Sequence, residues 1–294
     1  MSPEVIAQNL LFGLFVGSSY GLAAVGLSLV FGVLRVLNVA HGELLMLGGY
    51  AVFWLSTGLG LDPFLAAVAA GPLLFLLGLA LHQGLFGFVE RLDEESKVKN
   101  SLLISFGLTL VIQNAAQALW SADERSVSSG LVGGGAVLLG VAIPYSRLAT
   151  MLLGGAVVVA LHLLMHRTTF GLAVRATAED WEAASLAGID VRRAYLVTFA
   201  LGAALAGVAG GLVALQYSIA PAIGLAWTLK ALVVIVLAGL GSVVGTFVAG
   251  LALGVAEALS VFALGPAYRE VVGLGLFLLV LLLRPRGLFG RVES

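Results

Sequence analysis

Apolar residues fill long stretches of the chain, and few charged residues separate them. Runs without Asp, Glu, Lys or Arg cover residues 5–34, 44–61, 63–89, 100–122, 148–165, 194–229 and 231–256. Most of these runs reach the roughly 18 residues that a bilayer-spanning helix needs. The alternating pattern of barrel strands is absent. The pattern therefore predicts an all-α polytopic membrane protein in which residues 1–294 form one transmembrane domain.

The basic residues predict the orientation of the chain. Most of them lie at Arg35 and in residues 91–99, 166–193 and 284–291, and short loops rich in Lys and Arg face the cytoplasm. This places the N-terminus outside, with three crossings before Arg91, two more before His166 and four before Arg284. The predicted number of membrane crossings is thus nine, within a range of eight to ten. The 30-residue first run, about 45 Å long as a helix, has room for a break, and residues 225–283 can be divided in more than one way.

Composition supports this class and excludes others. The chain is 60% hydrophobic and 11% charged, with a mean hydropathy of +1.09, whereas soluble domains carry roughly 25% charged residues. This hydropathy predicts contact with membrane lipid, and a formal net charge of −1 without a basic stripe predicts no nucleic-acid partner. The absence of Cys excludes disulfides and thiolate metal sites. The first run has no basic residues before it and is too long for a signal peptide, so we expect it to be retained.

Glycine is unusually frequent, at 39 of 294 residues. Small residues recur four positions apart at 17 and 21, at 202, 206 and 210, at 241 and 245, and at 250 and 254. In lipid such spacing lets helix backbones approach closely, so helix packing is the favoured interpretation. The stretch AGLGSVVG at 238–245 differs because its three glycines also fit a break or a re-entrant turn.

Residues 166–193 form the longest polar interruption and carry eight charges. Within them, TAEDWEAASLAG has the features of a short helix, with Thr177 as the N-cap, Asp180 three residues later, and Gly188 as the C-terminal stop. A helix of about ten residues is marginal alone in water. We therefore expect it to dock, either on its own protein or in a groove of a partner through Trp181 and Ser185 and through Ala183, Leu186 and Ala187.

Residues 182–188, EAASLAG, resemble the EAA-x-x-x-G signature in the cytoplasmic coupling loop of ABC importer permeases. The stretches GLSLVFGVLRVLNVAHGELLMLGGY at 26–50, LAGLGSVVGTFVAGLALGVAEAL at 237–259 and RPRGLFGR at 284–291 resemble the LivH-type permeases of branched-chain amino acid ABC transporters. The I-x-L-P ending of the fuller EAA motif has no counterpart here, since residues 198–201 read TFAL. The likeness otherwise runs almost from end to end.

This resemblance implies a non-enzymatic permease subunit in the cytoplasmic (inner) membrane of a bacterium or archaeon. Its expected partners are two ABC ATPase subunits, a second homologous permease, and a periplasmic or lipid-anchored substrate-binding protein. The coupling residues would be Trp181, Glu182, Ala183, Ala184 and Gly188. The chain has no G-x-x-x-x-G-K-[ST] motif, so we expect no cofactor on it and ATP on the partners. The solute would be a branched-chain amino acid or another small solute.

A few polar residues interrupt the apolar runs and are candidates for the translocation path. Asn38 and His41 lie three apart, which would place them on one helix face, and Gly42 permits a local break that turns Glu43 toward the same cavity. Lys230 and Glu257 are further candidates. Such groups are costly in hydrocarbon unless they pair or face water. For Lys230 and Glu257 a mutually neutralising pair is the favoured interpretation.

Two other classes of protein compete with an ABC permease. An ion-coupled secondary transporter could use His41, Glu43, Lys230 and Glu257, but it has no need of an EAA-x-x-x-G helix. An intramembrane hydrolase would need a nucleophile and a base, for which only Ser18 or Ser19 with His41 is available. Residues 17–21 read GSSYG, which has Gly-x-Ser-x-Gly spacing around Ser19, but they lie inside a long apolar run and not at the strand-to-helix turn of a nucleophile elbow. The spacing to His41 fixes no geometry, so no catalytic residue and no metal ligand is predicted.

Overall fold

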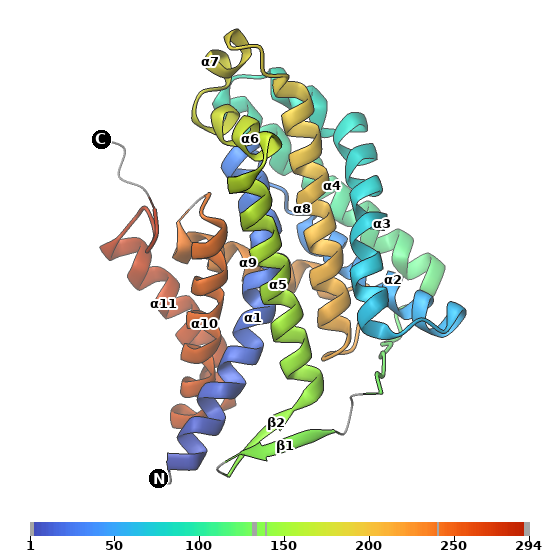
Figure 1. Cartoon of the computed structure of the whole chain (residues 1–294), viewed down its shortest axis with the longest axis vertical. Helices are drawn as coiled ribbons and strands as arrows, with labels where there is room; N and C mark the ends of the chain where they lie inside the picture. The colour runs from blue at the N-terminus through green and yellow to red at the C-terminus, as the bar shows by residue number, and fades with distance from the viewer. Residues whose placement is uncertain (1–2, 131–133, 139, 240, 291–294) are drawn as a thin grey trace.

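The computed structural model describes residues 3–290 apart from 131–133, 139 and 240 (Figure 1). The long helices are α1 (Pro3–Leu34), α2 (His41–Leu59), α3 (Pro63–Gly84), α4 (Glu94–Trp120), α5 (Tyr145–Arg167), α8 (Val191–Ala214), α9 (Ile223–Ala238), α10 (Val243–Leu264) and α11 (Arg269–Leu283). The short elements are η1 (Phe86–Arg91), α6 (Thr169–Glu179), α7 (Trp181–Leu186), η2 (Pro266–Tyr268) and the strands β1 (Gly135–Leu138) and β2 (Val141–Pro144).

The predicted all-α polytopic fold is confirmed. Within the described ranges, seven helices are long and apolar enough to cross a membrane, namely α1, α3, α4, α5, α8, α10 and the η2–α11 segment. The other two apolar helices are α9, which is shorter at 16 residues, and α2, which carries His41 and Glu43 in its first turn. The count of nine crossings therefore stays a prediction, and α1 continues without the break for which it had room.

The glycine spacing serves helix packing, as predicted, most clearly where α1 crosses α10. A Cβ added to Gly17 would lie 2.7 Å from the carbonyl oxygen of Gly250, and a Cβ on Gly254 would overlap the backbone of Gly17. Gly21 and Gly250 meet in the same way. Because only glycine fits this backbone contact, α1 and α10 pack as a closely joined pair.

Helix α8 occupies the centre of the other half of the bundle and packs against α1, α2 and α3. Its Gly207 faces Gly48 of α2 and Leu74 of α3, and its Gly210 faces the backbone of Leu45. The stretch 198–214 of α8 is almost entirely buried. This helix is therefore a core element that links the loop at its N-terminus to the rest of the bundle.

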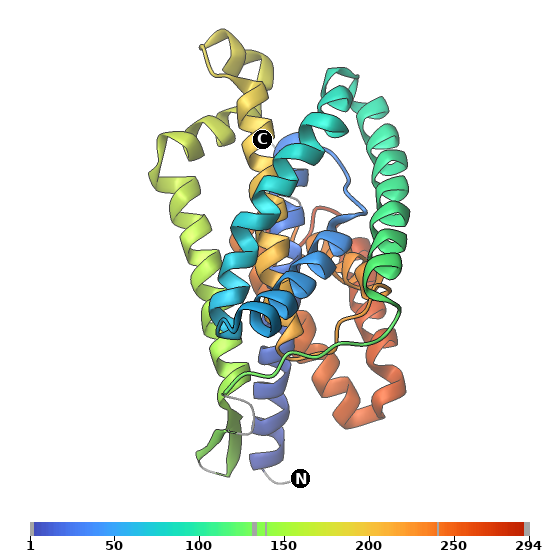
Figure 2. The same cartoon turned by 90° about the vertical axis from the view of Figure 1, so that its right-hand side faces the viewer.

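The basic segments gather at one end of the molecule, as the predicted orientation requires. Arg35, Lys97 and Trp181 line one cavity there, while Arg175 and Phe289 line another. Figures 1 and 2 show α6 and α7 at this end and the N-terminus with the two strands at the opposite end. Arg291, which belongs to the predicted basic tail, lies outside the described residues.

The hairpin of β1 and β2 was not predicted. It forms an antiparallel pair in the connection between α4 and α5. Gln8 of α1 donates from Nε2 to the carbonyl of Ala142 at 3.0 Å and accepts from its amide at 2.7 Å. These two bonds satisfy the backbone amide and carbonyl of Ala142 on an otherwise open strand edge. They also attach the hairpin to the start of α1.

The stretch 238–245 forms the predicted break. Helix α9 ends at Ala238 and α10 begins at Val243, with Gly239 at φ +92° and Gly241 at φ +86°. The C-terminal tail packs on this turn, since the amides of Leu288 and Phe289 donate to the carbonyls of Leu237 and Ala238 at 2.9 and 2.7 Å. Side chains favour negative φ, so glycine is required at both turn positions.

Candidate functional site

The helix carrying the EAASLAG signature, α7, begins at a side-chain cap. Asp180 Oδ1 accepts from the amides of Glu182 and Ala183 at 2.9 and 3.0 Å. The prediction of Thr177 as the N-cap is wrong. Thr177 is buried within the preceding helix α6, and its hydroxyl donates to the carbonyl of Ala173. Aspartate is an effective N-cap, and Asp180 lies between the end of α6 and the start of α7. The segment therefore forms two short helices instead of the single one predicted.

Gly188 ends α7 as predicted, in the left-handed conformation at φ +85°. The amide of Ile189 donates to the carbonyl of Ala184 and the amide of Gly188 donates to that of Ser185, both at 3.0 Å. These two bonds form a Schellman motif, which satisfies carbonyls that the helix end leaves without a helical partner. Both ends of a six-residue helix are therefore fixed by local bonds.

Most of α7 projects away from the protein. Ala184 is its one buried residue, at 5% exposure, whereas Leu186 is 91% exposed and Trp181 47% exposed. The ammonium of Lys97 lies 6.0 Å from the Trp181 ring centroid, which ties the first turn to α4. Glu182, Ala183 and Gly188 are also exposed. The helix thus presents a small, partly apolar surface of the size that a groove on another protein could receive.

A second feature lies inside the bundle, where the N-termini of α2 and α9 meet. The amide of Gly42 donates to Thr228 Oγ1 at 2.9 Å, and a Cβ on Gly42 would overlap the carbonyl of Gly224. From this junction the two helices run toward opposite ends of the molecule, α2 toward the turn before α3 and α9 toward the basic end. Meeting N-termini of this kind concentrate partial positive charge, which favours an anion between them.

Glu43 is the acidic residue at this junction. It is fully buried against Gly224, and neither carboxylate oxygen has a hydrogen-bond partner within the described part of the chain. His41 is also buried, and its Nε2 lies 2.9 Å from the carbonyl of Ala23. Their role in the translocation path stays a prediction, and in this conformation they contribute to the packed interior.

The predicted shared helix face of Asn38 and His41 is wrong. Residues 35–40 are not helical, and α2 begins only at His41. Asn38 is buried in the segment before the helix, where its Oδ1 accepts from the amide of Ala40 at 3.1 Å. This local side-chain bond competes with helix formation. The break therefore precedes Gly42, which is helical and is needed as glycine for the contact with Gly224.

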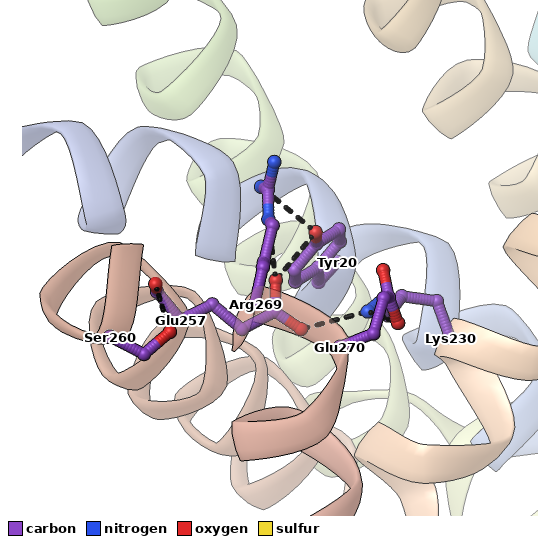
Figure 3. A network of polar contacts seen from close by, with 6 residues as sticks. All are labelled: Tyr20, Lys230, Glu257, Ser260, Arg269 and Glu270. Atoms are coloured by element: carbon purple, nitrogen blue, oxygen red, sulfur yellow. Dashed lines mark hydrogen bonds and ion pairs between the residues drawn. The ribbon is translucent and has the colours of Figure 1, made fainter. Parts of the chain in front are cut away.

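Lys230 and Glu257 form the expected pair, but within a larger network (Figure 3). Lys230 Nζ donates to Glu257 Oε1 and Glu270 Oε2, both at 2.8 Å, and Arg269 Nε donates to Glu257 Oε2 at 3.0 Å. The Tyr20 hydroxyl donates to Glu257 Oε2 at 2.9 Å. Glu257 is fully buried, so these three donors offset the loss of its hydration.

Sequence reasoning missed three members of this network: Tyr20, Arg269 and Glu270. The last two begin α11, and the short turn after α10 brings them back to Glu257. An Arg-Glu pair shortly after an intramembrane acid was a usable signal for them. Tyr20 comes from α1, and no sequence pattern links it to α10.

The serines considered for a hydrolase are not paired with His41. Ser18 donates to the carbonyl of Phe15 at 2.8 Å, and Ser19 accepts from Gln216 Nε2 at 3.3 Å. His41 contacts a backbone carbonyl instead. The geometry of a nucleophile activated by a base is therefore not present at these residues.

Multiple apolar helices, polar groups paired within them and a projecting capped helix at one end define a polytopic membrane protein with an exposed helix that another protein could bind. Residues 9–281 match the family described as branched-chain amino acid transport system, permease component. The chain therefore belongs to the family of branched-chain amino acid transport permeases.

Individual relatives agree with this family. The high-affinity branched-chain amino acid transport system permease protein BraD of Pseudomonas aeruginosa is 36% identical, over 99% of this chain and 98% of BraD. LivH of Escherichia coli is 34% identical, over 97% of this chain and 96% of LivH. The ribose import permease protein RbsC of Escherichia coli is 27% identical over 96% of this chain and 87% of RbsC. No solved structure matches the chain.

Family and fold together make this a multi-pass membrane protein, located in the inner membrane in bacteria. Its homologues are transporter permease subunits and not enzymes. A permease component works with the other components of its transport system, and a secondary transporter that acts alone is not favoured.

Proposed function

We propose that this chain is the membrane-spanning subunit of an ABC importer for branched-chain amino acids. It pairs with a second homologous permease and receives its solute from a binding protein outside. Two ATPase subunits inside bind ATP and drive transport, and this chain holds no cofactor and catalyses no reaction. Leucine, isoleucine and valine are proposed as solutes because the relatives with the highest identities are named for branched-chain amino acids.

The observation that carries this proposal is the exposed, doubly capped helix α7. A six-residue helix has little stability of its own, yet Asp180 and the Schellman motif at Gly188 fix both of its ends while most of its side chains stay exposed. Its exposed Glu182, Ala183 and Leu186 fit the recognition of a helix by a groove. The groove that receives α7 would lie on the ATPase subunit.

The connection from α7 to the membrane is short. Only residues 187–190 separate it from α8, and Asp190 Oδ1 caps α8 by accepting from the amide of Arg193 at 3.0 Å. A displacement of α7 by the closing ATPases is therefore transmitted to α8 with little slack. Helix α8 contacts α1, α2 and α3, so its movement repositions the helices that would switch the path from outward to inward facing.

Replacement of one exposed leucine tests the proposal. Leu186→Ser should reduce recovery of the ATPase subunits with the permease and reduce ATP-dependent leucine uptake in vesicles supplied with the binding protein, because it removes the most exposed apolar contact of α7. Leu172→Ser is the matched control, since Leu172 is 60% exposed on the neighbouring helix α6. If Leu186→Ser retained full ATPase recovery and uptake, α7 would not be the coupling element.

A further inference from the structure

A small cavity lies beside the charged network of Figure 3, on the side formed by α1, α9 and α11. It has a volume of about 150 Å³ and is lined by Tyr20, Tyr217, Ala226, Trp227, Lys230 and Arg269. Tyr217 lies in the loop after α8, at the end of that helix remote from α7, and Arg269 begins α11 after the turn from α10. The cavity therefore belongs to the half of the molecule opposite the coupling helix.

Three aromatic rings form its apolar wall. The Trp227 ring lies 5.9 Å from that of Tyr20 and 6.2 Å from that of Tyr217, with both pairs edge to face. The three rings come from α9, α1 and the loop after α8, so the tertiary fold alone brings them together. Clustered aromatic rings offer a large apolar surface together with polar edges, which suits a small solute with an aliphatic side chain.

Two cations, Lys230 and Arg269, lie against this wall, and each has more N–H donors than its described hydrogen bonds use. Lys230 Nζ has three N–H groups, and its two described bonds go to Glu257 and Glu270. Arg269 has five N–H groups, and its described bonds go to Glu257 and to the Tyr20 hydroxyl, the latter at 3.2 Å. The remaining donors can bind a carboxylate without breaking the bonds to Glu257.

The two acids of the network differ in how firmly they are held. The Glu257 side chain is fully buried, whereas that of Glu270 is 69% exposed and bonds only to Lys230 among the described residues. An exposed ion pair contributes little stability, because water competes for both groups. A solute carboxylate can therefore replace Glu270 at Lys230, which leaves the Glu270 carboxylate available to a positively charged group of the same solute.

We propose that this cavity is the outward-side site at which the permease binds the carboxylate of its amino-acid solute. Lys230 and Arg269 bind the carboxylate, the rings of Tyr20, Tyr217 and Trp227 contact the aliphatic side chain, and Glu270 accepts from the ammonium group. The proposal rests on the proposed function, which supplies the amino acid, and adds the residues of this chain that recognise it.

A single cysteine at Ala226 provides the test, because the chain has none of its own. Ala226 is exposed and lines the cavity, so Ala226→Cys adds one small side chain and leaves the rings and charges in place. The complex is reconstituted in phosphatidylcholine vesicles, which carry no free carboxylate, and is alkylated with a water-soluble maleimide. Leucine at ten times its dissociation constant should slow alkylation about tenfold, whereas leucinamide, which lacks the carboxylate, should not.

Two variants make the readout specific. Lys230→Gln in the Ala226→Cys background should abolish protection by leucine. Gly58→Cys, at an exposed glycine near the end of α2 with no atom close to its Cβ position, should react equally with and without leucine.

The outcomes separate this proposal from the proposed function. Vesicles that take up leucine with ATP but show no leucine protection at Ala226→Cys would overturn the site alone. Equal protection by leucinamide, or a cysteine inert to the reagent, would also overturn it. Protection that appears only when phosphatidylserine is added would assign the carboxylate to lipid and overturn the solute site. Protection without any ATP-dependent uptake would retain the site and refute the importer.

Discussion

Substitution of Gly188 tests whether the shape of the coupling loop controls transport. Gly188 has φ +85° at the end of α7, and no atom lies within 4 Å of the position of an added Cβ. A side chain there meets only the backbone penalty of the left-handed conformation, which is roughly 1–2 kcal/mol for ordinary residues. A β-branched residue is particularly unfavourable at positive φ. Gly188→Val should therefore release the Schellman motif without disturbing any contact in the bundle.

A penalty of this size reduces the ratio of ordered to disordered cap by a factor of about 5–30. A six-residue helix cannot absorb such a loss, because its stability depends on its two caps. Gly188→Asn is the matched control, since asparagine tolerates the left-handed region better than other residues with a side chain. We expect leucine-stimulated ATP hydrolysis to be fastest in the unsubstituted protein, slower in Gly188→Asn and slowest in Gly188→Val.

The assay uses the purified complex with its ATPases and binding protein, together with the amount of permease in the membrane fraction. Membrane abundance should be equal for all three proteins, because Gly188 lies outside the membrane-spanning helices. Full ATP hydrolysis by Gly188→Val would refute the argument. Equal inactivity of Gly188→Asn and Gly188→Val would also contradict it, because any side chain at this position would then block docking regardless of φ.

Two further predictions concern the interior. Gly42→Ala should lower the free energy of unfolding by about 1–3 kcal/mol, because the added methyl overlaps the carbonyl of Gly224, whereas Gly107→Ala in α4 meets no atom and should raise it by up to about 1 kcal/mol. Thermal unfolding in detergent measures both, and equal shifts would contradict the close approach of α2 and α9. Glu257→Ala should cost about 1–3 kcal/mol by leaving Lys230 and Arg269, which are only partly buried, without their shared partner, whereas Glu270→Ala, at the exposed end of the same network, should cost less than about 1 kcal/mol. A Glu270→Ala variant as unstable as Glu257→Ala in the same unfolding assay would show that the exposed acid is equally essential.

The parts of the structure that the sequence predicted are those governed by local rules. The apolar runs became helices because a backbone in lipid must satisfy its own hydrogen bonds. The stop at Gly188 depends on one residue's freedom to adopt positive φ. The pair of Lys230 and Glu257 was recognisable because isolated charges in apolar runs need partners.

The parts that the sequence did not predict depend on contacts between distant segments. Thr177 and Asp180 are both acceptable N-caps, and the choice between them depends on α6, whose buried Gly171 and Val174 anchor it to the bundle. Likewise, Tyr20 joins Glu257 only because α1 crosses α10 at their glycines. Neither outcome is encoded in a local pattern.

The glycine contacts also connect the coupling helix with the buried acid of α2. Helix α8 begins shortly after α7, and its Gly207 and Gly210 lie against Gly48 and Leu45 of α2 at backbone contact. Helices joined at the backbone move together more readily than they slide, because a shift would drive one backbone into the other. A displacement of α7 would thus reach α2, whose first turn holds Glu43 against the start of α9. A displacement of the coupling loop would therefore be transmitted through α8 and α2 to the junction of α2 and α9, where the buried carboxyl group of Glu43 lies.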